Sequence, residues 1–315
     1  MIDLDIVIVN WNTGPQLREC LQSISIASAA SILRLCNCVV VDNASLDGSA
    51  DGLEALPLPL KVIWNPENKG FGYACNQGAE PGFAEYLLFL NPDVRLFPDS
   101  LTKALLFLQD IKNEQVGILG IQLVDQNGVV QRNVAHFPTP SSLFYQMLGL
   151  DRMCPRHFQP HFMTNWDHRD SLEVDQVTGA FFLVRRKVYE DLKGFDERYF
   201  MYFEDLDFAF RAKQAGWKSF YLADAQAFHH GGGATGQVKA RRLSYVLNSR
   251  VLYVAKHFGV PSARGILLAS VGLELWARLG WSLITLSRQN FLETLRGYGM
   301  FAGTLPHLLK DMKNE

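Results

Sequence analysis

The chain has 315 residues, of which 48% are hydrophobic and 20% are charged, and its formal net charge is -2. This length allows one large α/β domain or a domain with an appendage, and it is ample for a sizeable core. The near-neutral charge gives no electrostatic argument for a nucleic-acid partner.

The cysteines and the N-terminus both indicate a cytoplasmic protein. The five cysteines form no CxxC pair, which favours reduced, buried thiols. The opening residues, MIDLDIVIVNW, lack the basic region and the apolar run of a signal peptide. We therefore expect the first strand to begin almost at Met1.

Residues 1–94 alternate between β-branched apolar runs and amphipathic stretches. This alternation predicts a mostly parallel central sheet with helices on both faces. The expected strands cover residues 4–11, 36–45, 60–64 and 85–94, and the expected helices between them cover 13–28, 47–56 and 72–80.

Polar residues stand at the carboxyl end of each of these strands. They are Asn10 and Asn12, Asp42 and Asn43, Asn65 and Asn68, and Asn91 and Asp93. In open α/β sheets, ligands bind beyond the carboxyl ends of the strands. We therefore expect a ligand site at this edge.

Further along, the pattern predicts a helix over 101–111, a strand over 115–125 and a hairpin turn at Asn127 and Gly128. Residues 137–175 are rich in Pro, His and aromatic residues, which is typical of an ordered loop. A strand and a helix follow within 177–197, and long helical segments begin at about Lys239. We expect a catalytic domain over 1–236 and a C-terminal helical extension over 237–315.

Several polar residues are candidates for chemistry. Asp93 follows a strand and could hold a divalent cation that neutralises a diphosphate, although Asn-Pro-Asp by itself favours a simple turn. Asp42 could accept a hydrogen bond from a base or could cap the next helix, and the two interpretations are evenly balanced. The stretch NKGFGYACNQG has glycines that allow close backbone approach, but it is neither GxGxxG nor a Walker loop.

Two later stretches add histidines and acids. FHHGGG places His229 and His230 before three glycines, without the spacing of a zinc site. The segment YFMYFEDLDFAFR, residues 199–211, sets three acids among aromatic residues. If it is helical, Asp207 pairs with Arg211, because the two are four residues apart. Glu204 and Asp205 are left beside an apolar rim, where a carboxylate with a raised pKa can act as a general base.

These motifs together, with VIVNWN, VVVDNASLDGS and LLFLNPDV, stand in an order that resembles the family 2 inverting glycosyltransferases with the GT-A fold. The resemblance is strongest to bacterial rhamnosyltransferase-like members and runs continuously over residues 6–233. It implies a GT-A (nucleotide-diphospho-sugar transferase) fold with a C-terminal helical extension.

The resemblance also implies roles for particular residues. Asp205 matches the catalytic base, with Glu204 as its supporting neighbour. On physical grounds, nearby aromatic side chains could stack on a sugar face and exclude water; they are Tyr199, Phe200, Tyr202 and Phe203. Asp93 matches the end of the metal-binding DxD motif, and His229 matches a late metal or diphosphate ligand. The nucleotide-binding residues would be Asn10, Trp11, Asn12, Asp42, Asn68, Gly70 and Asn76. Two further candidates for the metal site are His230 and Asn91, which stands where the family often has an acid.

The function implied is an inverting, metal-dependent hexosyl transfer in cell-surface polysaccharide synthesis. The expected donor is dTDP-L-rhamnose, the expected cofactor is Mg²⁺ or Mn²⁺, and the acceptor is a saccharide or a lipid-linked saccharide. The alternatives are a UDP-sugar-dependent family 2 enzyme, a sugar nucleotidyltransferase and a non-catalytic binding module. The basic, Gly-rich triphosphate loop that would favour a nucleotidyltransferase is missing near the first strand.

Residues 263–287 are apolar enough to suggest a membrane, but Glu274 and Arg278 interrupt a spanning helix. One interpretation is an in-plane helix with Trp276 and Trp281 at the interface, supported by nearby arginines. The protein would then be peripheral on the cytoplasmic face of the inner membrane. The alternative interpretation of residues 263–287 is a helix packed on the catalytic domain or on a second copy in a homodimer.

Overall fold

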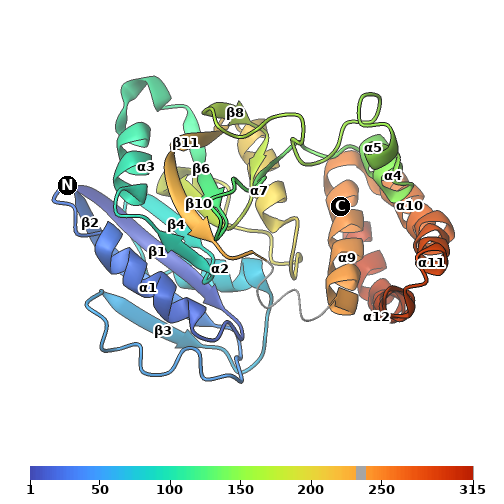
Figure 1. The fold of residues 1–315 in the computed structure, drawn as a ribbon, viewed down its shortest axis with the longest axis horizontal. Coiled ribbons are helices and arrows are strands. Elements are labelled where there is room, and N and C mark those ends of the chain that lie inside the picture. The colour runs from blue at the N-terminus through green and yellow to red at the C-terminus, as the bar shows by residue number, and fades with distance from the viewer. Residues whose placement is uncertain (232–238, 315) are drawn as a thin grey trace. The chain divides into compact units, whose positions relative to one another are not determined.

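The computed structural model describes residues 1–231 and 239–314 (Figure 1), and the chain divides into two compact units. The first, called the sheet unit, comprises Met1–His136, Phe162–Arg198 and Glu204–Ala234. The second, called the helical unit, comprises Phe137–His161, Tyr199–Phe203 and Thr235–Glu315. The domain boundary predicted between residues 236 and 237 lies outside the described residues.

The sheet unit is built on a nine-stranded mixed sheet in which the order of the main path is β3-β2-β1-β4-β10-β6-β11-β5, with β8 paired to β11. The first four strands on this path are parallel, while β10 runs antiparallel to both β4 and β6. The strands are β1 (Ile2–Asn10), β2 (Leu33–Asp42), β3 (Leu60–Trp64), β4 (Tyr86–Leu90), β5 (Val94–Leu96), β6 (Val116–Val124), β8 (Leu172–Val174), β10 (Phe181–Arg185) and β11 (Lys218–His229). A second, two-stranded sheet pairs β7 (Val134–Ala135) with β9 (Gln176–Val177).

Helices cover the sheet because each presents one apolar stripe to it. In α1, for example, Leu17, Cys20, Leu21 and Ile24 recur at helical spacing and are all buried. The central strands are buried along almost their whole length, as a sheet covered on both faces requires. The helices of the sheet unit are α1 (Gln16–Ala27), α2 (Phe71–Ala79), α3 (Ser100–Gln109), the short 3₁₀ turn η1 (Ile111–Asn113), α6 (Arg186–Asp191) and α7 (Glu204–Gln214).

The mostly parallel α/β fold predicted from the sequence is confirmed, but one predicted helix is wrong. Residues 47–56 form turns instead of a helix. Gly48 and Gly52 adopt φ of +68° and +62°, and the Asp47 side chain accepts from the Ser49 amide. Asp, Ser and Gly stabilise turns at least as well as helix starts, so the capping pattern was misleading. The hairpin turn is confirmed, since Val124 and Val130 form an antiparallel bridge and Gly128 has φ +74°.

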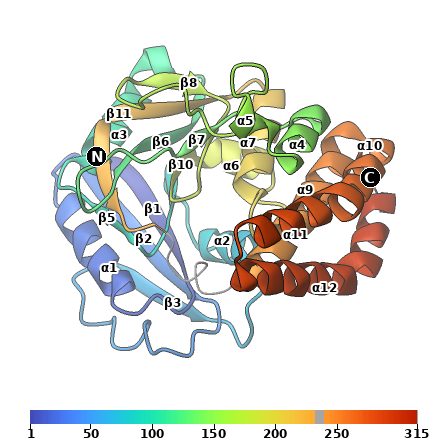
Figure 2. The same ribbon diagram turned by 45° about the vertical axis from the view of Figure 1, so that its right-hand side comes forward.

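The helical unit contains the long helices predicted after Lys239, together with two short helices from the loop over 137–175. Its elements are α4 (Pro140–Met147), α5 (Leu150–Met153), α9 (Lys239–Phe258), α10 (Val260–Ala269), the π turn η2 (Ser270–Glu274), α11 (Leu275–Ile284), α12 (Arg288–Asp311) and the 3₁₀ turn η3 (Met312–Asn314). α10, η2 and α11 form one continuous helix, and α9 packs against both α10 and α12 (Figure 2).

A buried ion cluster joins these helices. Glu274 is 3% exposed and accepts from Arg250 of α9 and, at 2.8 Å, from Arg278 one turn along its own helix. Burial by itself raises the pKa of Glu274, but the two guanidinium groups outweigh it and hold the pKa below its usual value. The Tyr298 hydroxyl of α12 donates to the Ser270 carbonyl at 2.9 Å. Polar contacts therefore hold the Val260–Ile284 helix along one face.

Candidate functional site

The carboxyl ends of β1 and β2 meet in a network of short polar side chains. Buried Asn10 donates to Asp42 Oδ1 at 2.7 Å and to Ser49 Oγ at 2.8 Å, while Asp42 Oδ2 accepts from the Ser45 amide. Asn10 and Asp42 are also partners in the strand register. The predicted meeting of the strand ends is confirmed here. The proposed contacts of these two residues with a nucleotide stay predictions.

The loop after β1 bends back over the same network. Asn12 has φ +53°, its amide donates to Ser45 Oγ at 3.0 Å, and its side-chain oxygen accepts from the Leu46 amide at 2.8 Å. Asn tolerates this left-handed conformation better than most residues. Half-buried Trp11 precedes it. The two residues thus lie directly beside the Asn10–Asp42 pair.

A second chain of amides continues the network to β3 and α2. Asn43 donates to Asn68 Oδ1 at 3.0 Å and to the Gly70 carbonyl at 3.1 Å, and it accepts from Asn65 at 3.2 Å. Asn65 in turn exchanges hydrogen bonds with Gln77 of α2. Gly70 has φ +94°, a conformation that favours glycine. The loop before α2 is therefore preorganised by side-chain amides.

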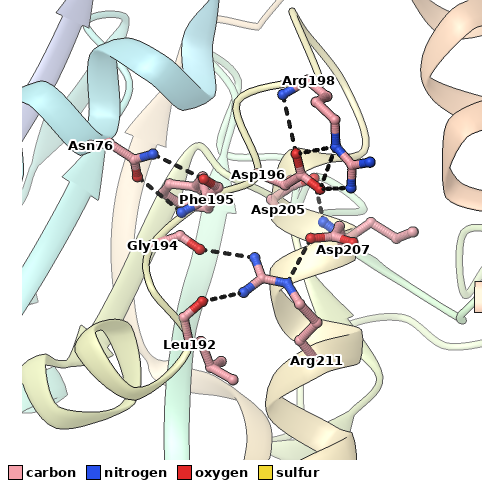
Figure 3. A network of polar contacts seen from close by, with 10 residues as sticks. Asn76, Leu192, Gly194, Phe195, Asp196, Arg198, Asp205, Asp207 and Arg211 are labelled. Carbon is pink, nitrogen blue, oxygen red and sulfur yellow. Dashed lines mark hydrogen bonds and ion pairs between the residues drawn. The ribbon is translucent and has the colours of Figure 1, made fainter. Parts of the chain in front are cut away.

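Asn76 of α2 binds the loop that leads to α7 (Figure 3). Its oxygen accepts from the Phe195 amide at 2.9 Å and from the Tyr189 hydroxyl at 2.7 Å. Its nitrogen donates to the Phe195 carbonyl and to Glu197. These four bonds use the whole hydrogen-bonding capacity of the amide. The role that the geometry supports for Asn76 is to position this loop, and its predicted nucleotide contact stays untested.

Asp207 and Arg211 hold the other side of that loop. Arg211 donates to Asp207 Oδ2 at 2.7 Å, to the Leu192 carbonyl at 2.7 Å and to the Gly194 carbonyl at 2.9 Å (Figure 3). The predicted ion pair is confirmed, and Asp207 is fully buried. Because Arg211 spans both the helix and the loop, it fixes the first turn of α7.

That first turn carries Glu204 and Asp205. Asp205 is half-buried, and its two oxygens accept from the Gly179 and Leu206 amides, each at 2.8 Å. Glu204 is 6% exposed, and its Oε2 has no hydrogen-bond partner among the described residues. Burial raises the pKa of both carboxyls, and the charge of Asp205 raises that of Glu204 further. A carboxylate with a raised pKa suits proton abstraction near neutral pH.

The aromatic segment before Glu204 belongs to the helical unit and packs on α9. Phe200 lies 4.6 Å from the Tyr245 ring and Phe203 lies 5.6 Å from the Tyr253 ring, between ring centroids. Tyr202 and Phe203 have φ of +67° and +70°, which costs about 1–2 kcal/mol per residue. Phe200 and Phe203 therefore contact rings of the protein, and stacking of this segment on a sugar stays a prediction.

Asp93 and His229 lie side by side at the ends of β4 and β11. His229 Nε2 is 3.5 Å from Asp93 Oδ1, and both side chains are largely buried. Gln131 holds the other face of the histidine, because its Oε1 lies 2.7 Å from His229 Nδ1 and its Nε2 donates to the His229 carbonyl. With the proton on Nδ1, the lone pair of Nε2 is directed toward Asp93. His230 is exposed and gives its backbone amide to the Asp93 carbonyl at 3.1 Å.

The Asp93 turn and Asp205 are linked through a single backbone segment. The Gly179 amide contacts Asp205, and the next carbonyl, that of Ala180, accepts from the Asn91 amide at 3.0 Å. Asn91 begins the turn that closes at Val94, and this turn positions Asp93. The turn interpretation of Asn-Pro-Asp is thus confirmed, and the turn also brings Asp93 to His229.

Sequence reasoning missed two contributors to this geometry. Gln131 follows a hairpin whose turn was predicted, but no local pattern connects it to a histidine 98 positions later. Gly179 supplies a backbone amide, for which any residue type could serve. Both act through tertiary contacts, so a motif search has no signal for them.

The sequence model of the family described as "Glycosyl transferase family 2" matches residues 5–193, which is more than half of the chain. The chain belongs to this family. The match includes the carboxyl ends of β1, β2, β3 and β4 and stops before α7 and β11, and it confirms the family inferred from the motifs.

Relatives of this family 2 glycosyltransferase include bacterial rhamnosyltransferases. It is 29% identical over 275 residues to N-acetylglucosaminyl-diphospho-decaprenol L-rhamnosyltransferase of Mycobacterium tuberculosis, covering 81% of this chain and 85% of that protein. It is 26% identical over 196 residues to rhamnosyltransferase WbbL of Escherichia coli, covering 59% of this chain and 70% of that protein.

The fold of this family 2 glycosyltransferase is similar to that of solved GT-A structures. Mannosyltransferase PcManGT from Pyrobaculum calidifontis, solved in complex with GDP-Man and Mn²⁺, matches with a TM-score of 0.53 at 14% identity. The match covers 95% of this chain and 86% of that one. The GT-A fold predicted from the sequence is therefore confirmed.

Proposed function

We propose that this family 2 glycosyltransferase moves L-rhamnose from dTDP-L-rhamnose to a saccharide on a lipid diphosphate, with inversion, in cell-surface polysaccharide synthesis. Two relatives described above are rhamnosyltransferases, which supports rhamnosyl transfer, and the name of one of them specifies a decaprenol-linked acceptor. Their identity of 29% and 26% supports the class of donor sugar and leaves the acceptor saccharide open.

The observation that carries the proposal is the Asp205 carboxylate, which has a raised pKa and is held by two backbone amides at the first turn of α7. In the proposed step, Asp205 takes the proton of an acceptor hydroxyl as its oxygen attacks the anomeric carbon. The bond from that carbon to the diphosphate oxygen breaks on the opposite face, so the configuration inverts. The transition state has oxocarbenium character, as in glycoside hydrolysis.

The pair of Asp93 and His229 fits a divalent cation. Among the described residues there is no cluster of three or more His, Cys, Asp or Glu side chains that could hold a metal, so two protein ligands would act with diphosphate oxygens and water. Mg²⁺ is commonly held in this way, by one or two carboxylates and substrate phosphates. When bound, the cation would neutralise charge on the departing diphosphate.

Gln131 adds a specific reason for this fit. A histidine that ligates a metal usually donates its second ring N–H to an oxygen that fixes its orientation. The 2.7 Å contact between His229 Nδ1 and Gln131 Oε1 supplies such a partner. The same arrangement leaves Nε2 on the side of Asp93, 3.5 Å from Oδ1.

A thermal-shift screen tests the donor and the cation together. The protein is heated with dTDP, UDP or GDP, each with Mn²⁺, with Mg²⁺ or with chelator. A ligand that binds only the folded state raises Tm by mass action. We expect the largest rise with dTDP and a cation. A larger rise with UDP or GDP would reject the donor, and an equal rise with chelator would reject the metal site.

A further inference from the structure

The continuous helix Val260–Ile284 presents a large apolar surface that the helical unit leaves uncovered. This helix is long and apolar enough to cross a membrane, yet only 28% of its most apolar stretch is buried. Trp276 and Trp281 are 67% and 65% exposed. The exposed large apolar side chains of this helix, together with Leu286 just after it, are here called the apolar face: Leu268, Val271, Leu273, Trp276, Trp281, Leu283, Ile284 and Leu286.

The apolar face has no uncompensated charge within it and has arginines at both ends. Between Arg264 and Arg288 the charged residues are Glu274 and Arg278, which pair with each other. Arg264 and Arg288 are both exposed. Aromatic residues at the level of the head groups and basic residues beside them are typical of helices that lie in a membrane interface.

The charge of the chain is divided unevenly, and the C-terminal part that contains the apolar face is the cationic one. Residues 237–315 contain eleven lysines and arginines against four aspartates and glutamates, a net charge of +7. The whole chain contains 30 lysines and arginines and 32 aspartates and glutamates. Residues 1–236 therefore contain 19 basic and 28 acidic residues, a net charge of -9. A cationic segment attached to an anionic one is attracted to anionic lipid through the cationic segment alone.

The polar contacts on the opposite side of the helix favour an in-plane arrangement over a spanning one. Arg250 of α9 donates to Ser270 at 2.8 Å and to Glu274, and Tyr298 of α12 donates to Ser270. A spanning helix would carry this charged cluster and parts of α9 and α12 into the hydrocarbon, at a high free-energy cost. A helix lying in the interface keeps the cluster on the protein side.

We propose that the apolar face binds the surface of an anionic phospholipid bilayer, with the two tryptophans inserted at the head-group level. Arg264 and Arg288 then contact lipid phosphates. This inference rests on the helical unit alone and does not depend on the donor, the cation or the acceptor of the proposed function. It assigns the chain to the membrane periphery.

Vesicle co-sedimentation of the full chain tests the proposal. The vesicles contain phosphatidylcholine alone, or phosphatidylcholine and phosphatidylglycerol in equal amounts, without acceptor or nucleotide. We expect binding to the mixed vesicles, weakened by salt, and little binding to phosphatidylcholine alone. Equal binding to both compositions, or to neither, would overturn the proposal.

Two pairs of variants separate the tryptophans from the charges. Trp276→Ser with Trp281→Ser should lower the partition coefficient by at least roughly tenfold. Arg264→Gln with Arg288→Gln should lower it by roughly 30-fold on mixed vesicles. The matched controls lie in the sheet unit: Phe83→Ser, at a phenylalanine 72% exposed, and Lys61→Gln with Lys187→Gln, at exposed lysines. Both controls should bind as the unchanged protein does.

A second copy of the chain is the competing occupant, and sedimentation velocity without lipid distinguishes it. If the apolar face is a dimer interface, the tryptophan variant changes a dimer into a monomer while vesicle binding stays the same. That result would overturn the proposal. An unchanged sedimentation coefficient together with lost vesicle binding supports the membrane surface, and circular dichroism establishes that each variant is folded.

Discussion

Two buried glutamates, one in each unit of the molecule, show how environment decides the use of a carboxyl group. Glu274 in the helical unit lies between Arg250 and Arg278, and its pKa is lowered. Glu204 in the sheet unit lies beside Asp205, and burial and the neighbouring charge raise its pKa. Both side chains are at most 6% exposed, so the difference comes from their partners.

The opposite pKa shifts of the two glutamates distinguish a structural carboxylate from one suited to proton transfer. A buried carboxylate with cationic partners is held ionised and joins helices, which is the role of Glu274. A buried pair of acids without a cation retains at least one proton up to a higher pH than an exposed carboxyl group does, as in catalytic pairs. Three residues beyond Glu204, Asp207 has a guanidinium partner, that of Arg211. The predictions below change one carboxyl or one supporting group at a time.

The largest expected effect is that of Asp205→Asn on transfer. Removing a general base lowers kcat by roughly 10²–10⁴-fold. Both carboxylate oxygens accept from backbone amides, and the Nδ2 of asparagine cannot accept, so one of these bonds is lost. This loss costs about 1 kcal/mol, while relief of the buried charge offsets part of it. Sugar-transfer rates and Tm measured on the same sample check the prediction. Asp224→Asn, at an exposed acid of β11, is the control that keeps full activity.

The unchanged enzyme should also lose activity as pH falls through the pKa of Asp205, because the protonated carboxyl cannot accept the acceptor proton. Since that pKa is raised above 3.8, the acid limb of the kcat profile should lie above this value. A profile that stays flat down to pH values near 3.8 would contradict the assignment of the base.

Glu274→Gln should have the largest effect on stability. It leaves Arg250 buried without its anionic partner, and breaking a buried pair in this way costs about 3–5 kcal/mol. Urea unfolding measures the free energy. Glu114→Gln, at an exposed glutamate, should change it by less than about 0.5 kcal/mol. An equal effect of the two substitutions would show that the cluster does not hold these helices together.

Gln131→Met should weaken the cation response without changing the fold. The substitution keeps the approximate volume but removes both contacts with His229. Loss of such an orienting partner lowers metal affinity by roughly 10–100-fold. Activity titrated with Mn²⁺ should therefore reach a similar plateau at a higher concentration. Gln115→Met, at an exposed glutamine, should leave the titration unchanged.

Glu204→Gln should change the pH dependence of stability. Because the pKa of Glu204 is raised in the folded state above its ordinary value of 4.5, its contribution to stability is fully present below that value and is lost as pH rises through the folded pKa. The glutamine of the variant does not titrate, so its contribution to the free energy of unfolding does not fall as pH rises. Its free energy of unfolding relative to the unchanged protein should therefore increase with pH, by at most about 1.4 kcal/mol per pH unit. A pH-independent difference would mean that Glu204 has an ordinary pKa.

The sequence by itself determined the family and the main architecture. Alternating β-branched runs and amphipathic helices predict a parallel sheet, because strands buried on both faces must be apolar throughout. Polar residues at the strand ends predicted where Asn10 and Asp42 meet, and the pairing of Asp207 with Arg211 followed from their helical spacing. These are local or periodic signals, so they can be recognised without knowing which segments meet. The strand β11 was not predicted from the sequence, because exposed polar residues such as Asp224 and Gln226 interrupt its apolar pattern.

Only the tertiary structure decided which charges have partners. In the sequence, Glu204 and Glu274 each stand in an aromatic or apolar stretch with an arginine four or seven residues away. The structure gives Glu274 a second cation from α9, 24 positions earlier, and places Glu204 beside another acid, Asp205. It likewise brings Gln131 to His229 across 98 positions. A pKa depends on the charges within a few ångströms, and the fold, rather than the local sequence, determines those neighbours.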